Sequence, residues 1–144
     1  MNALVIYAHP NPLSFNAALA TVVEEELQKK GAEVNVKDLY GMDWNPVLSE
    51  DDFRSFHTGK LPEDISSEQN DVKQADFIVV IAPVWWYSVP AILKGYFDRV
   101  FSIGFAYEYT KTGSRGLLTD KKALVITTSG ADEQTAETDR KSVV

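Results

Sequence analysis

The sequence contains no cysteine among its 144 residues. Disulfide bonds, thiolate catalysis and most structural zinc sites are therefore excluded, and the composition fits a reducing compartment. No stretch approaches the roughly 20 consecutive apolar residues of a membrane-spanning helix, and no lysine or arginine precedes the first apolar run. We therefore expect a cytoplasmic protein with no signal peptide and no direct membrane insertion.

Basic residues are also scarce. Lys and Arg number 14 against 21 Asp and Glu, which gives a net charge of −7, and the basic residues form no stripe. A surface of this sign disfavours nucleic acid and anionic membranes as partners. The two histidines are His9 and His57, and His57 has no second histidine at metal-ligand spacing. We expect no metal site.

Short apolar runs bounded by turn residues predict a parallel sheet. Residues 3–8 and 77–82 are continuously apolar, as in strands buried on both faces, and 123–128 reads as a fourth strand. Residues 33–38 alternate, which predicts an edge strand. The first strand, the helix after it and this edge strand make a right-handed βαβ unit. The pattern predicts a single α/β domain over 1–144 with a doubly wound parallel sheet.

Helical periodicity is clear in two segments. One follows Ser14 and ends at Gly31, and the other runs from Ala91 to Phe101, with Pro90 suited to its first turn. A shorter helix is expected over 68–75. Glycines and prolines interrupt the helical pattern within 39–70, so we expect a long loop there with one short helix that starts near Glu50. We also expect a long loop over 104–116.

The polar stretch 129–144 carries no strand pattern. An open doubly wound sheet of flavodoxin type has a fifth strand and a closing helix. We therefore expect the C-terminal strand and helix of that fold to be missing from this sequence.

Three loops should emerge together at the carboxyl edge of the sheet, where open α/β sheets bind ligands. The first loop, 9–16, ends at a helix N-terminus, which favours a phosphate, and His9, Ser14 and Asn16 can donate hydrogen bonds to it. The alternative is that Ser14 only caps the helix and His9 is an ordinary loop residue. The loop lacks the glycine pattern of a P-loop or a dinucleotide-binding turn.

The second loop, 82–90, is rich in aromatic side chains. Trp85, Trp86 and Tyr87 suit a planar apolar ring, or else they plug an interface. The third loop, Thr127-Thr128-Ser129-Gly130, offers hydroxyls and amides for a polar ring edge, although a plain strand-ending turn would look similar. Together, the three loops predict a flavin mononucleotide site.

Tyr107 and Tyr109 alternate in a segment flanked by glycines. They could gate a site or pack as an ordinary edge hairpin. No catalytic acid or base can be named from the sequence.

The sequence resembles the flavodoxin-like NAD(P)H:quinone oxidoreductases, a family that includes bacterial modulators of drug activity and potassium-efflux ancillary proteins. The resemblance covers about residues 1–130. It rests on Ala8-His9-Pro10 with Ser14-Phe15-Asn16, on Asp38-Leu39-Tyr40, on Asn45-Pro46-Val47-Leu48-Ser49, on the segment 90–101 and on Gly104-Phe105-Ala106-Tyr107.

The resemblance implies a role for each loop. His9, Ser14, Phe15 and Asn16 would hold the phosphate and ribityl end of the flavin. The isoalloxazine would be lined by Pro83, Val84, Trp85, Trp86 and Tyr87, and along its other edge by Thr127, Thr128, Ser129 and Gly130. Trp85 would shape the acceptor site, and Tyr107 and Tyr109 of a partner subunit would help to wall it, since the family is typically dimeric.

The function implied is transfer of two electrons from NAD(P)H through FMN to a quinone or similar acceptor. FMN is favoured over FAD only because no element for an adenine can be identified. Two alternatives stay open: a flavin-binding ancillary subunit of a membrane transporter, and an inactive, truncated homologue.

Overall fold

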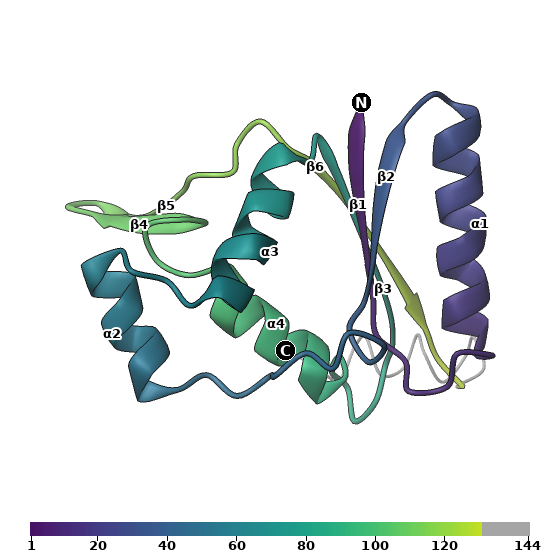
Figure 1. The fold of residues 1–144 in the computed structure, drawn as a ribbon, viewed down its shortest axis with the longest axis horizontal. Helices are drawn as coiled ribbons and strands as arrows, with labels where there is room; N and C mark the ends of the chain where they lie inside the picture. Colours follow the sequence, from purple (N-terminus) through teal and green to yellow (C-terminus); the bar gives the residue numbers. More distant parts are fainter. Residues whose placement is uncertain (131–144) are drawn as a thin grey trace.

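Four parallel strands form the centre of the structure, in the order β2-β1-β3-β6 (Figure 1). They are β1 (Asn2–Tyr7), β2 (Glu33–Asp38), β3 (Phe77–Pro83) and β6 (Lys122–Thr128). The computed structural model describes residues 1–130. The doubly wound parallel sheet is confirmed, and so is the position of β2 at an edge.

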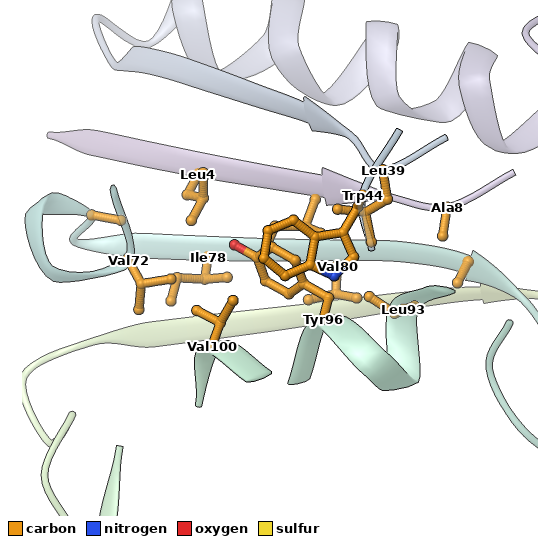
Figure 2. Packing of buried hydrophobic residues seen from close by; sticks show 13 residues of the cluster. Leu4, Ala8, Leu39, Trp44, Val72, Ile78, Val80, Leu93, Tyr96 and Val100 are labelled. Atoms are coloured by element: carbon orange, nitrogen blue, oxygen red, sulfur yellow. The ribbon is translucent and has the colours of Figure 1, made fainter. Parts of the chain in front are cut away.

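Helices cover both faces of the sheet. The helix α1 (Phe15–Lys29) packs on one face, while α3 (Glu63–Gln74) and α4 (Ala91–Val100) pack on the other (Figure 1). The apolar side chains between sheet and helices form two separate layers, because successive residues of a strand point to opposite faces. Tyr96 lies at the centre of the layer under α4, against Trp44 and Val80 (Figure 2).

Two segments differ from the sequence expectation. The short helix expected near Glu50 is α2 (Glu50–Thr58), and the helix expected over 68–75 is α3, which already begins at Glu63 inside the range expected to be a loop. Both helices are polar and bury few apolar side chains, so apolar periodicity underestimates them. The range 104–116 is a two-stranded antiparallel ribbon of β4 (Tyr107–Thr110) and β5 (Gly113–Gly116), not an open loop. Pro90 is the N-cap of α4 and precedes its first turn.

A buried arginine ties α4 to the segment before it. The Arg99 guanidinium donates to both carboxylate oxygens of Asp52, at 3.0 and 3.2 Å, and to Asp64 at 2.6 Å. It also donates to the Asn45 carbonyl oxygen at 3.0 Å and stacks 5.0 Å from the centre of the Trp44 ring. These contacts hold α2, α3 and the connecting loop against one face of α4.

Gly95 explains how closely that loop approaches α4. A Cβ at this position would lie 2.1 Å from the Pro46 carbonyl oxygen, which is far inside van der Waals contact. A glycine in mid-helix costs about 1 kcal/mol relative to alanine. The close approach of the backbone accounts for its presence.

β6 is the other edge of the described sheet. Leu124 and Val125 point to opposite faces, and both are exposed, Val125 to 62%. The expectation that a fifth strand and a closing helix are missing concerns residues 131–144 in part, and these lie outside the described residues. Over residues 1–130, no helix is both long enough and apolar enough to cross a bilayer.

We predict that Arg99→Met lowers the free energy of unfolding by about 3 to 5 kcal/mol, because it leaves the buried Asp52 carboxylate unpaired. Lys94→Ala is the matched control, since Lys94 lies on the same helix and pairs with Asp98 at the surface. Its cost should stay below about 1 kcal/mol. Urea denaturation followed by circular dichroism measures both, and equal costs would contradict the prediction.

The same ion pair predicts a loss of stability in acid. Burial alone would raise the pKa of Asp52, but hydrogen bonds from Arg99 and from Ser49 outweigh it and hold the pKa below its ordinary value of 3.8. A carboxyl with a depressed folded-state pKa contributes stability above its unfolded pKa and loses it as the pH falls. Stability of the wild-type protein should therefore drop below about pH 4, and Asp52→Asn should flatten that part of the profile.

Candidate functional site

Loops that follow β1, β3 and β6 meet at the carboxyl edge of the sheet, as the sequence predicts. The His9 ring lies 5.7 Å from the Trp85 ring, edge to face. The backbone N–H of Val84 donates to the Thr128 carbonyl oxygen at 2.8 Å. The first loop therefore contacts the second, and the second contacts the third.

Internal hydrogen bonds shape the first loop. The Asn11 N–H donates to Nδ1 of His9 at 3.1 Å, and the Asn11 side chain accepts from the Leu13 N–H at 2.9 Å. Because Nδ1 is an acceptor, the neutral imidazole carries its proton on Nε2, which can donate to a ligand. Ser14 is the N-cap of α1, and its hydroxyl oxygen accepts from the Ala17 N–H at 3.1 Å.

Two backbone donors remain at the start of α1. Within residues 1–130, neither the Phe15 N–H nor the Asn16 N–H has an acceptor. They lie at the positive end of the helix dipole, where an anion is stabilised. The Phe15 side chain is exposed, so the backbone of Phe15 is the part placed to hold a phosphate. Residue type could not have revealed this distinction.

Asn16 has a different side-chain role from the one the sequence suggests. It is buried, and its amide forms hydrogen bonds with the Thr128 hydroxyl at 3.0 and 3.2 Å. The two residues lie 112 positions apart in the chain. The Asn16 side chain therefore joins the first loop to the third, while its backbone N–H has no acceptor within residues 1–130.

The aromatic loop contains an unusual turn. Trp85 and Ser88 exchange backbone hydrogen bonds at 2.8 and 3.1 Å, so Trp86 and Tyr87 are the central residues of a two-residue hairpin. Both have positive φ angles, 51° and 60°, which is the type I′ pattern that normally selects asparagine and glycine. Left-handed backbone at bulky residues costs about 1 to 3 kcal/mol each and clusters at ligand sites.

This turn projects its aromatic rings into solvent. Trp86 is 95% exposed and Tyr87 71% exposed, while Trp85 is held partly by the His9 ring. Pro83 is buried at the end of β3, and Val84 is partly exposed. An exposed apolar surface of this kind marks a place where a ligand or partner binds.

The third loop completes a site without formal charge. Thr127 and Thr128 end β6, and Ser129 and Gly130 follow. None of the three loops contains Asp, Glu, Lys or Arg, although the chain carries a net charge of −7. Neutral donors with flat apolar side chains fit a ligand that joins a planar ring system to a phosphate.

The structure does not bring Tyr107 and Tyr109 to these loops. Both belong to β4, and their rings contact each other at 5.7 Å. In Figure 1 the ribbon of β4 and β5 lies beyond α3 and α4, on the side away from the sheet. Within a single chain, these two residues are part of an edge hairpin, which is one of the two alternatives. Their assignment to the site of a second subunit stays a prediction.

The sheet order, the helices on both faces and the loops at the carboxyl edge define a doubly wound α/β protein of flavodoxin type. A sequence model of the family described as having a flavodoxin-like fold matches residues 1–143. The chain belongs to this family.

Relatives with known sequences extend the comparison. The chain is 44% identical to an NAD(P)H oxidoreductase, otherwise uncharacterized, of Haemophilus influenzae, covering 92% of this chain and 66% of that protein. It is 38% identical to NAD(P)H dehydrogenase (quinone) 1 of Cavia porcellus, covering 91% of this chain and 54% of that protein. The chain thus spans about half to two thirds of the length of these relatives.

A solved structure agrees in fold. The NAD(P)H:quinone oxidoreductase of Methanothermobacter marburgensis superposes with a TM-score of 0.86 at 32% sequence identity, over 96% of this chain and 73% of that one. The backbone arrangement that carries the three loops is therefore shared with an enzyme of that name.

We predict that replacing Trp86-Tyr87 by Asn-Gly stabilises the unliganded protein by about 1 kcal/mol, because the new residues accept positive φ without strain. Urea denaturation measures this change. The single substitution Val84→Ala, in the same loop but outside the turn, should not stabilise the protein. A lower free energy of unfolding for the Asn-Gly variant would show that the turn is not strained.

Proposed function

We propose that this chain binds a flavin through its mononucleotide portion, as FMN or as the corresponding half of FAD, and acts as an NAD(P)H:quinone oxidoreductase. The observation that supports this most directly is the meeting of three uncharged loops. One loop has helix N-terminal amides without an acceptor within residues 1–130, and one has an exposed aromatic turn. The names of the relatives give the reaction class.

The donor set suits a phosphate. Nε2–H of His9, the Ser14 hydroxyl and the N–H groups of Phe15 and Asn16 would hold it without any fixed positive charge. The Asn16 side chain acts indirectly, since its hydrogen bonds to Thr128 fix the distance between the phosphate loop and the third loop. The ribityl chain would lie between these two loops.

The aromatic and hydroxyl-bearing loops suit a tricyclic ring. Pro83, Val84 and the Trp85-Trp86-Tyr87 turn would line one side, and the segment Thr127 to Gly130 would present hydroxyls and amides to the polar edge. A bound flavin supplies hydride acceptance from NAD(P)H and two-electron transfer to a quinone. The protein orients the ring, excludes water with its indoles and offers backbone donors to developing negative charge.

A homodimer is part of the proposal. The side chains of Trp86 and Tyr87 leave a large apolar area uncovered in one chain. The ribbon with Tyr107 and Tyr109 projects beyond α3 and α4, on the side away from the sheet (Figure 1). A two-stranded ribbon is marginally stable by itself and gains from packing against another surface. We propose that the ribbon of one subunit forms one side of the acceptor site of the other. We also propose that the protein acts in the cytoplasm.

The first experiment is a visible absorption spectrum of the purified protein, before and after FMN and then NADPH are added without oxygen. We expect a bound yellow flavin whose visible absorbance is lost when the nucleotide is added. A protein that stays colourless with both FMN and FAD would refute flavin binding. Bound flavin that NADPH and NADH leave oxidised would instead favour an ancillary, non-catalytic role.

A variant tests the aromatic turn. We expect Trp86→Ala to reduce flavin retention about tenfold while the free energy of unfolding stays within about 0.5 kcal/mol, because the side chain is almost fully exposed. Phe53→Ala is the control, since Phe53 is an exposed aromatic residue of α2 away from the three loops. Equal flavin content in the wild-type protein and the Trp86→Ala variant would contradict the proposal that Trp86 lines the flavin ring.

A further inference from the structure

Thr128, the last residue of β6, is bonded to both of the other loops. Its hydroxyl forms hydrogen bonds with the side-chain amide of Asn16 in the first loop, at 3.0 and 3.2 Å. Its carbonyl oxygen accepts from the Val84 N–H in the aromatic loop, at 2.8 Å. The rings of His9 and Trp85, 5.7 Å apart, join the first loop directly to the aromatic loop. The three loops therefore form a closed ring of contacts, and Thr128 takes part in two of the three.

The contact of Thr128 with the aromatic loop does not depend on its side chain. Thr128 is the register partner of Pro83, and β6 pairs with β3 through backbone groups. Because proline has no N–H, the donor to the Thr128 carbonyl oxygen is the next residue, Val84. A substitution of the Thr128 side chain therefore leaves the aromatic loop bonded to the end of β6.

The contact with the first loop does depend on the side chain, and it is buried. Asn16 is only 4% exposed. The Thr128 hydroxyl donates its one proton to Oδ1 of Asn16, so it has no proton left for a carbonyl group of a bound ring. The backbone N–H of Asn16 has no acceptor within residues 1–130 and is one of the proposed phosphate donors. One residue thus carries both a phosphate donor and the partner of Thr128, which fixes the spacing between phosphate and third loop.

A ligand that spans the first and third loops depends on this spacing, and a ligand without a phosphate does not. FMN would contact the first loop through its phosphate and the other two loops through its ring. Riboflavin has the same ring and ribityl chain but no phosphate. When one ligand makes two contacts, the second gains from the effective concentration that the first sets, and a looser spacing reduces this gain. A break between Asn16 and Thr128 should therefore weaken FMN and spare riboflavin.

We propose that the Thr128 side chain is a positioning group, which holds the phosphate loop at the distance from the ring that FMN requires and does not itself bind the ring. The inference rests on the proposed function, since it concerns the same flavin site. It divides a residue that the sequence suggests as a ring ligand into two parts. The side chain sets the spacing of the loops, and the backbone lies at the edge of the ring.

The experiment compares the dissociation constants of FMN and riboflavin for protein stripped of flavin, by isothermal titration. The wild-type protein should bind FMN more tightly than riboflavin. Thr128→Val should raise the dissociation constant of FMN about tenfold and that of riboflavin less than about twofold. Thr128→Ser keeps the hydroxyl and should retain the wild-type values. Thr58→Val is the matched control, because it removes a hydroxyl hydrogen bond on α2, away from the three loops.

A second variant covers the case in which Thr128→Val does not fold, since that substitution leaves the buried Asn16 amide without its partner. Asn16→Leu combined with Thr128→Val replaces both polar groups, which costs less than the loss of one. It should show the same selective loss of FMN.

Each outcome has a distinct meaning. Equal loss of FMN and riboflavin in the Thr128→Val protein overturns the inference, because the hydroxyl would then serve the ring or the fold as a whole. Unchanged FMN affinity in that variant, or an equal loss of FMN in Thr128→Ser, also overturns it. Equal affinities of the wild-type protein for FMN and riboflavin overturn it without any variant and leave flavin binding intact. Failure of both ligands to bind the wild-type protein would refute the proposed function itself.

Discussion

The parallel pairing of β1 with β3 is the constraint on which the rest of the structure depends. The two strands pair in register from Ala3 with Phe77 to Tyr7 with Ile81, and the Ala8 N–H extends the ladder to the Ile81 carbonyl oxygen. The chain leaves β1 into α1 on one face of the sheet and leaves β3 into α4 on the other. The chain therefore turns to opposite faces of the sheet after these two strands, and in open α/β sheets ligands bind at the carboxyl edge where this happens.

Much of this arrangement could be predicted from the sequence, because the strands are short and apolar. A run such as 77–82 has few alternatives to a buried parallel strand, and once three such runs are recognised their following loops must share one edge. The bounds of the polar helices α2 and α3 were harder to predict from the sequence. In α3 only Ile65 and Val72 are buried apolar residues, and the neighbouring buried Glu68 and Gln69 bond to other elements. The acidic run Glu50-Asp51-Asp52 indicated the start of α2, and the structure adds a capping box between Ser49 and Asp52 there.

Contacts between distant residues could not be predicted. Asn16 reads as a phosphate ligand because it stands in the phosphate loop, yet its side chain binds Thr128 at the end of another strand. Arg99 reads as one charge on a helix, and its burial with Asp52 and Asp64 depends on the packing of three helices. Local sequence patterns carry no information of that kind.

The aromatic turn has a cost to the folded chain that a bound ligand or a second subunit would offset. Trp86 and Tyr87 hold left-handed backbone and expose large rings, two features that separately destabilise a protein without a ligand. A flat ring system that covers both indole and phenol recovers apolar burial at about 25 cal/mol per Å² and fixes the turn in the conformation it already has. The absence of charge in the three loops acts in the same direction, because uncharged walls can exclude water without burying an unpaired ion. Strain, exposure and neutrality therefore coincide at one edge of the sheet, as preorganisation for the proposed flavin requires.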